Sequence, residues 1–167
     1  MINGKPDEID LKLLGILQED ASMDLARLAK LVNRSPSPVH ERLKRLRQEG
    51  YVKAQVALLD RALVGQPVLV IVHVKLKRQT QALLRDFEQI AVDMAEVQFC
   101  LHVSGGWDFI LHVTAATPQD YYVFLMERIC AQANVEHVES SFVMKECKSY
   151  GPLILPKAVF TEKNAAG

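Results

Sequence analysis

The chain has 167 residues, of which 49% are hydrophobic and 24% charged, and its 20 basic side chains are balanced by 20 acidic ones. This composition supports a folded core and excludes an intrinsically disordered chain, while the length allows one large domain or two small ones. The longest aliphatic run, residues 68–72, is far short of the roughly 18 apolar residues of a membrane span, and no signal-peptide core is present at the N-terminus. We therefore expect a cytoplasmic protein with no membrane partner. The three scattered cysteines argue against a disulfide framework or a thiolate zinc site.

The neutral average hides an uneven distribution of charge along the chain. Residues 1–26 contain two basic and six acidic side chains, whereas residues 27–53 contain eight basic and two acidic ones. A local cationic patch neutralises phosphates whatever the rest of the chain carries, so the local balance is the relevant one. Nucleic acid therefore remains a candidate partner.

The first fifty residues show the signals of three short helices. Apolar side chains at helical spacing predict a helix over residues 8–18 and a shorter one over residues 24–33. Ser35 followed by Pro36 opens a third helix, and Gly50 ends it because glycine accepts a left-handed conformation. The side chains that we expect to face inward are Ile9, Leu13, Ile16, Leu17, Leu25, Leu28, Ala29, Leu31, Val39, Leu43 and Leu46.

The third helix carries basic and short polar side chains opposite its apolar face. Such a helix, preceded by a tight turn and a second amphipathic helix, suits the major groove of DNA: arginine reaches guanine acceptors, and serine or histidine reaches base edges or phosphates. A solvated helix face is the alternative for an isolated run of charges, but the helix-turn-helix context favours DNA. The candidate DNA-binding residues are Ser35, Ser37, Pro38, His40, Glu41, Arg42, Lys44, Arg45 and Gln48.

The rest of the chain predicts a linker and then a sheet covered by two helices. Residues 51–59 look strand-like, and residues 60–65 form a turn or short helix. Beyond them the order β-α-β-β-α-β indicates a four-stranded antiparallel sheet with two helices on one face, the ferredoxin-like arrangement of an α+β protein. We predict strands over residues 68–76, 97–103, 109–115 and 135–148, with the two middle strands paired as a hairpin, and helices over residues 80–94 and from Pro118. The helical side chains expected to face the sheet are Leu83, Leu84, Phe87, Ile90, Met94, Tyr122, Leu125, Met126 and Ile129.

Several of these motifs resemble those of one family. The run Ser35 to Leu46, followed by Glu49 to Val52, closely resembles the helix-turn-helix signature of the leucine-responsive regulator and AsnC (Lrp/AsnC) family of bacterial transcription factors, also called feast/famine regulators. Similar agreement with the family's opening helix, ligand-domain hairpin and last strand is found at Asp10 with Ile16-Leu17, at residues 102–109 and at residues 140–146. The resemblance covers residues 7–155.

The resemblance implies a fold with four segments. These are a winged-type helix-turn-helix domain over residues 1–52, a strand or hinge linker over residues 53–66, a ferredoxin-like effector-binding and oligomerisation domain over residues 67–155, and a tail over residues 156–167. Where the family often has a glycine-arginine pair between the first two helices, this chain has Ala21-Ser22. A phosphate contact from this loop is therefore not expected.

The resemblance also implies a regulator of transcription that binds double-stranded DNA and senses an amino acid or a related metabolite. Such proteins are dimers that assemble into rings, often octamers, with the effector between neighbouring subunits. No cofactor, metal or catalytic residue is implied.

The effector hypothesis rests on the hairpin between the two middle strands. Glycines let backbone N–H groups approach a ligand carboxylate, and an aspartate accepts hydrogen bonds from an α-ammonium group, so the pair suits a zwitterion. A plain hairpin turn is the alternative reading of the same residues. A serine of the last strand is a further candidate, although its facing is undetermined. The candidate effector-binding residues are Ser104, Gly105, Gly106, Asp108, Ser140 and Ser141.

Three alternatives compete with the regulator. Cys100, His102 and His112 have the same parity along their strands, which raises a metal or haem site, but ordinary packed side chains explain them better. A tetrapyrrole- or haem-handling enzyme or sensor is possible on this two-domain layout, yet the basic third helix and the absence of a nucleophile-base pair argue against it. A purely structural assembly protein differs from the regulator in lacking salt-sensitive binding to duplex DNA.

Overall fold

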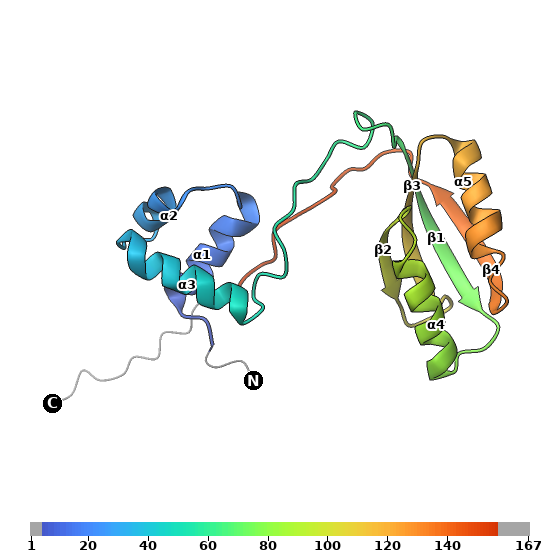
Figure 1. The fold of residues 1–167 in the computed structure, drawn as a ribbon, viewed down its shortest axis with the longest axis horizontal. Coiled ribbons are helices and arrows are strands. Elements are labelled where there is room, and N and C mark those ends of the chain that lie inside the picture. Colours follow the sequence, from blue (N-terminus) through green and yellow to red (C-terminus); the bar gives the residue numbers. More distant parts are fainter. Residues whose placement is uncertain (1–4, 157–167) are drawn as a thin grey trace. The chain divides into compact units, whose positions relative to one another are not determined.

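The computed structural model describes residues 5–156, which divide into two compact units (Figure 1). Unit 1 combines the chain up to Ala57 with the chain from Lys148 onward, and unit 2 runs from Leu58 to Cys147. Within residues 5–156, no helix has both the length and the apolar character needed to cross a membrane.

Unit 1 contains the three predicted helices, α1 (Glu8–Glu19), α2 (Leu25–Leu31) and α3 (Pro36–Gln48). Local chemistry explains where they begin and end. Asp7 caps α1, and its side chain accepts a hydrogen bond from the backbone N–H of Asp10. Asn33 and Gly50 adopt φ values of 53° and 79° just after α2 and α3, the left-handed conformation that ends a helix.

The core of unit 1 is a small apolar cluster. Leu31 is 53% exposed, contrary to the prediction, because α2 ends at this residue and the chain then turns Val32 inward instead. The remaining predicted inward positions are buried or partly buried. The buried members of the cluster are Leu13, Leu28, Ala29, Val32, Val39 and Leu43.

The chain that follows unit 2 returns to α1. The Gln18 side chain accepts a hydrogen bond from the backbone N–H of Leu153 (2.7 Å) and donates one to its carbonyl (3.4 Å), and the Tyr150 hydroxyl donates to the Gln18 carbonyl. Residues 148–155, which we expected in the second domain, therefore lie in unit 1. Of the expected tail over residues 156–167, residues 157–167 lie outside the described residues.

The linker contains the expected turn but not the expected strand. Residues 53–60 are irregular, because no other segment of the described chain pairs with them, and a strand exists only where its backbone groups find a partner. Asp60 opens the following turn by accepting hydrogen bonds from the backbone N–H groups of Ala62 and Leu63.

Unit 2 has the predicted ferredoxin-like architecture (Figure 1). Its strands pair antiparallel in the order β2-β3-β1-β4, which confirms the hairpin between β2 and β3. The last strand ends at Phe142 rather than at residue 148, because Phe142 already pairs with Val70 near the start of β1. The elements are β1 (Val68–Leu76), α4 (Gln81–Val92), β2 (Val97–His102), β3 (Phe109–Ala115), α5 (Pro118–Phe124), the π-helical turn η1 (Leu125–Ile129) and β4 (Val135–Phe142).

One face of the sheet carries the core of unit 2. Alternate residues of β1 and β3 pack against both helices, so α4 and α5 cover the same face. In α5 the buried side chains are Tyr121 and Phe124, whereas Tyr122 of α5 and Met126 of η1, which we expected to face the sheet, are exposed. Leu125 and Ile129 of η1 pack against the core as predicted. Ile90 of α4 lies at the exposed margin of this core.

The sheet register separates the candidate metal ligands. In the hairpin, Cys100 pairs with Leu111 and His102 with Phe109 on the helix-covered face, whereas His112 pairs with Phe99 on the opposite face. Even-numbered residues of β2 therefore share a face with odd-numbered residues of β3, contrary to the shared face that parity suggested. Within residues 5–156 no group of three or more His, Cys, Asp or Glu side chains is placed to hold a metal ion.

Candidate nucleic-acid interface and hairpin site

The polar arc of α3 is exposed where the sequence predicted it. Burial of Val39, Leu43 and Leu46 fixes the rotation of the helix, so the opposite arc faces solvent. Ser35 precedes the helix and makes no side-chain capping bond. The exposed candidate residues are Ser35, Ser37, Pro38, His40, Glu41, Lys44, Arg45 and Gln48.

Two arginines of α3 lie against α1 instead of extending freely into solvent. Arg42 Nη1 donates to Asp10 Oδ1 (2.8 Å) and to Asp7 Oδ2 (2.6 Å), and Arg45 Nη2 donates to Asp10 Oδ2. Asp10 is only 1% exposed, so this is a buried carboxylate between two guanidinium groups. Hydrogen bonds to Asp10 and then to Asp7 raise the pKa of Arg42 above its ordinary value. The ion pairs join α1 to α3 and hold α3 in place.

Asp7 takes part in the same network. It forms a capping box with Asp10, in which each side chain accepts a hydrogen bond from the other's backbone N–H. Burial raises the pKa of Asp7, but the hydrogen bonds from Asp10 and Arg42 outweigh it, so the pKa lies below its ordinary value. The start of α1 therefore carries negative charge that faces the basic helix.

Other cations of unit 1 are available to solvent. Lys44 is exposed and forms no ion pair with any described residue. Arg47 is exposed and donates a 3.3 Å hydrogen bond to Gln55. Lys44 is thus the basic side chain of the candidate arc that no carboxylate of the described chain neutralises.

The loop between α1 and α2 is acidic. Asp20 Oδ1 accepts hydrogen bonds from the hydroxyl (2.6 Å) and the backbone N–H (2.9 Å) of Ser22. These bonds, the hydroxyl first, lower the pKa of Asp20. A carboxylate held in this turn agrees with the expectation that the Ala21-Ser22 loop contributes no phosphate contact.

The hairpin between β2 and β3 presents its glycines to open space. Ser104, Gly105 and Gly106 are exposed, and Gly105 adopts a φ of 120°, which side chains rarely tolerate. A Cβ atom at either glycine would meet no atom within 4 Å. Room for a ligand therefore exists above this part of the backbone.

Asp108, in contrast, is buried and already has partners. Its Oδ2 accepts hydrogen bonds from the Leu76 backbone N–H (2.8 Å) and the Gln79 side chain (3.3 Å), and its Oδ1 accepts one from Lys75 Nζ (3.4 Å). We expected an open carboxylate ready for a ligand ammonium group. In the structure, the Asp108 carboxylate instead anchors the hairpin to the end of β1.

Sequence reasoning missed the aromatic contact beside this anchor. The Trp107 ring contacts two histidines, with centroid distances of 5.6 Å to His73 on β1 and 5.5 Å to His137 on β4. The buried His73 Nδ1 has no hydrogen-bond partner within the described chain. Only the pairing of β1 with β4 brings the three rings together, so no spacing in the sequence pointed to them.

The two candidate serines of β4 point to opposite faces. Ser140 lies on the helix-covered face, where its hydroxyl bonds the Tyr121 hydroxyl, and Ser141 pairs with Ile71 on the other face. Ile71 is five positions along β1 from Leu76, where Asp108 is bound, a distance of roughly 16 Å along a strand. Within one chain, neither serine joins the hairpin in a single site.

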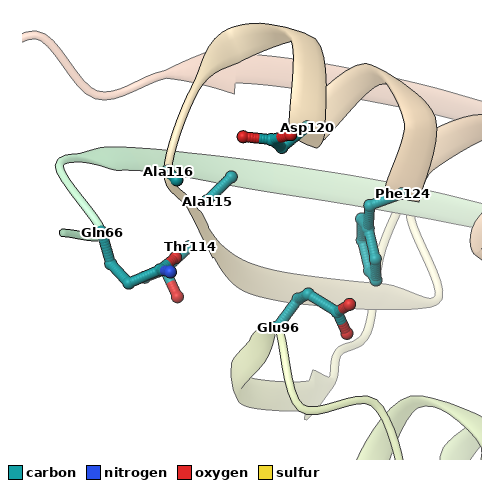
Figure 2. A pocket seen from close by; sticks show the side chains of 7 residues that line it. All are labelled: Gln66, Glu96, Thr114, Ala115, Ala116, Asp120 and Phe124. Carbon is teal, nitrogen blue, oxygen red and sulfur yellow. The ribbon is translucent and has the colours of Figure 1, made fainter.

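A hollow of about 190 Å³ lies at the C-terminal end of β3 (Figure 2). Figure 2 shows the carboxylates of Asp120 and Glu96 on opposite sides of it. Asp120 is already bonded to the Thr117 hydroxyl (2.7 Å) at the start of α5. None of the candidate site residues lines this hollow. It is lined by Gln66, Glu96, Thr114, Ala115, Ala116, Asp120 and Phe124.

Comparisons with known proteins agree over both units. Residues 6–53 match the family profile described as winged helix-turn-helix DNA-binding, and residues 69–153 match that of the Lrp/AsnC ligand binding domain. The chain is 33% identical over 149 residues to the leucine-responsive regulatory protein of Haemophilus influenzae, which covers 89% of this chain and 90% of the relative. It is 32% identical over 142 residues to the DNA-binding transcriptional activator DecR of Escherichia coli, with 85% and 93% covered.

A solved structure supports the same relationship. A transcriptional regulator from Neisseria meningitidis, crystallised as a complex with L-methionine, superposes with a TM-score of 0.84 at 29% identity and covers 90% of this chain and 97% of that one. The names of these relatives lend no support to the haem-handling alternative.

Proposed function

Because the chain belongs to the Lrp/AsnC family, we propose that it is a sequence-specific DNA-binding transcription regulator controlled by an amino acid or a related small metabolite. The observation that carries the DNA-binding part is the exposed polar arc of α3, opposite a buried apolar face, in the second helix of a helix-turn-helix. We also propose a cytoplasmic location, because that is where a bacterial regulator meets its DNA targets.

Recognition by such a helix requires two copies. A single helix-turn-helix reads too few bases for selectivity, so we infer a dimer whose two α3 helices meet half-sites about one helical turn apart. The uncovered face of the sheet supports this inference, because it exposes Phe99 (61%) and Leu101 beside Ile71 and Ile110. Large apolar side chains exposed together on one face are typical of an interface. Assembly of dimers into an octamer is proposed on the family resemblance.

The effector is proposed to bind at the hairpin, with Ser104, Gly105 and Gly106 offering backbone N–H groups to a carboxylate. The L-methionine complex of the meningococcal relative supports an amino acid as ligand. Asp108 contributes by holding the hairpin in place rather than as a free acceptor. Ser140 or Ser141 would join such a site only from a neighbouring copy, which suits an effector located between subunits.

The DNA-binding proposal is tested by selecting a duplex from a random pool with the full-length protein and then measuring its affinity at several salt concentrations. Lys44→Ala should weaken binding to the selected duplex by about tenfold, the size of one good base or phosphate contact. Lys12→Ala is the matched control, because Lys12 is an exposed lysine of α1 already paired with Glu8 at 2.8 Å. A pool that never enriches, or equal affinity for both variants, would count against α3 as the recognition helix.

The effector proposal is tested by calorimetric titration with each of the twenty amino acids. Gly106→Leu should abolish the heat of the ligand that binds while leaving the unfolding temperature of the free protein unchanged, because the new side chain enters open space. Ala133→Leu, at an exposed turn of unit 2, is the control. A folded protein that gives no heat with any amino acid leaves the hairpin without support as a site.

A further inference from the structure

Asp10 is a charged side chain buried at the start of α1. It lies one helical turn before Leu13 and Leu14 on α1, and all three side chains are buried. Each carboxylate oxygen is used: Oδ1 accepts from Arg42, and Oδ2 accepts from Arg45 and from the Asp7 backbone N–H at 3.1 Å. A buried carboxylate persists in a protein only when it is paired in this way.

The two arginines that Asp10 binds differ in how many of their guanidinium N–H groups remain free to contact DNA. Arg42 is more enclosed and has a second acidic partner in Asp7, so its guanidinium is held between two carboxylates. The Arg45 side chain is 46% exposed; its Nη2 donates to Asp10 and its Nε lies 4.0 Å from Glu49 Oε2. Its Nη1 has no partner within the described chain, so this part of the guanidinium remains available on the exposed arc of α3. The two residues are three apart on one helix, so a single carboxylate fixes both side chains at once.

We propose that Asp10 is a positioning residue for DNA recognition, which holds the Arg45 guanidinium ready for a base contact and withdraws Arg42 from the DNA phosphates. This inference rests on the proposed DNA-binding function. An arginine already fixed by a carboxylate loses less conformational freedom when it reaches a base, and its planar group keeps the orientation that a two-bond contact to guanine needs.

The same carboxylate limits nonspecific attraction. Two arginines free to move would each seek phosphates on any sequence, and every added phosphate contact steepens the salt dependence of binding by about 0.9 in the log-log slope. With Asp10 in place, their charge is partly neutralised before DNA arrives. Asp10 thus favours selectivity over general affinity, and Lys44 remains as an exposed cation of the arc that no described carboxylate pairs with.

The test compares Asp10→Asn with Glu8→Gln in the full-length protein. Both substitutions remove one negative charge from α1 and keep the side-chain shape, but Glu8 pairs, among residues 5–156, only with Lys12 on its own helix. Affinity is measured for the duplex selected by the wild-type protein and for a scrambled duplex, across a range of salt, after correction for the folded fraction. Asp10→Asn should lower the ratio of the two affinities by about tenfold and steepen the salt slope on the scrambled duplex by about 1 to 2. Glu8→Gln should change neither quantity.

A merely structural role for Asp10 predicts a different result. Loss of fold alone would weaken binding to both duplexes alike and would leave the salt slope unchanged, which would overturn the proposal.

If Asp10→Asn shows no cooperative unfolding transition, Arg45→Lys takes its place. This variant keeps the charge and the Arg42 pair but loses the planar fork, so the affinity ratio should fall while the salt slope stays constant. An unchanged ratio for Arg45→Lys would also overturn the proposal, whereas failure of the wild-type protein to select any duplex would instead overturn the proposed function.

Discussion

Different interactions stabilise the interior of each of the two units. Unit 2 buries apolar side chains of a four-stranded sheet and two helices in one continuous core, and its buried Asp108 serves to tie a hairpin to β1. Unit 1 has a smaller apolar cluster, and its helices are joined by the ion pairs of Asp10 and by the returning chain at Gln18. The stability of unit 2 therefore depends mainly on burial of apolar side chains. Ion pairs and hydrogen bonds contribute a larger share of the stability of unit 1. This difference matters for the proposed function, because the ion pairs of unit 1 involve α3, the proposed recognition helix.

The largest expected effect comes from emptying the core of unit 2. Phe109 is fully buried and packs against Phe87 with ring centroids 4.8 Å apart. Phe109→Ala should lower the free energy of unfolding of unit 2 by about 3–5 kcal/mol, because it leaves a cavity that the sheet does not close. Trp107, the single tryptophan, reports unfolding of this unit by fluorescence in a urea titration. Leu63→Ala, at an exposed position of the same unit, should have almost no effect. Similar losses for the two variants would contradict this account of the core.

A smaller effect is expected at the polar anchor of unit 2. Asp108→Ala leaves the buried backbone N–H of Leu76 without its acceptor, which should lower the free energy of unfolding by about 1–3 kcal/mol. Asp86→Ala, which removes an exposed carboxylate of α4, is the control and should cost much less. The measurement is made on the free protein, again by urea titration. A variant as stable as wild type would show that Asp108 does not anchor the hairpin. The Asp108 carboxylate would then again be a candidate to accept hydrogen bonds from a ligand.

In unit 1 the returning chain offers a more modest test. Gln18→Ala removes both hydrogen bonds to Leu153, so the free energy of unfolding measured by circular dichroism should fall by about 0.5–1.5 kcal/mol. Trypsin should also cleave faster after the exposed Lys148, because the segment that follows is released from α1. Gln48→Ala, at an exposed position of α3, should change neither quantity. Equal cleavage rates for the two variants would mean that the returning chain is not held by Gln18.

Local signals in the sequence were enough to predict most elements of the fold. The bounds of β1 and β3 match the predicted residues, and α3 begins at Pro36 as the Ser-Pro pair indicated. These elements depend on periodicity and end signals within a few residues. The strand expected over residues 51–59 does not form, since pairing depends on what lies beside a segment and not on its own residues.

The candidate site was predictable only in part, for the same reason. The solvent arc of α3 follows from its three buried residues, so Ser37, His40 and Lys44 were found from spacing alone. The ion pairs of Asp10 with Arg42 and Arg45 join residues more than thirty positions apart, and only the packing of α1 on α3 brings them together. The hydrogen bonds of Asp108 and the opposite facing of Ser140 and Ser141 likewise depend on sheet register.

The smallest expected effect is a pH dependence that distinguishes the two units. The pKa of Asp7 is lowered in the folded protein, so the unfolded chain binds more protons than the folded one as the pH falls through the range near 4. The stability that Asp7 contributes is therefore present above its unfolded pKa and is lost as the pH falls through its folded pKa.

Asp7→Ser keeps an N-cap but removes the ionisable group, so the unfolding midpoint of unit 1, followed by circular dichroism, should fall less steeply between pH 5 and pH 3 than in the wild-type protein. At pH 7 the loss should stay below about 1 kcal/mol, because the pair with Arg42 is half-exposed. The Trp107 signal of unit 2 should respond equally to acid in both proteins, since Asp7 belongs to unit 1. An unaltered acid response of unit 1 in Asp7→Ser would show that its pH sensitivity does not arise from the charged start of α1.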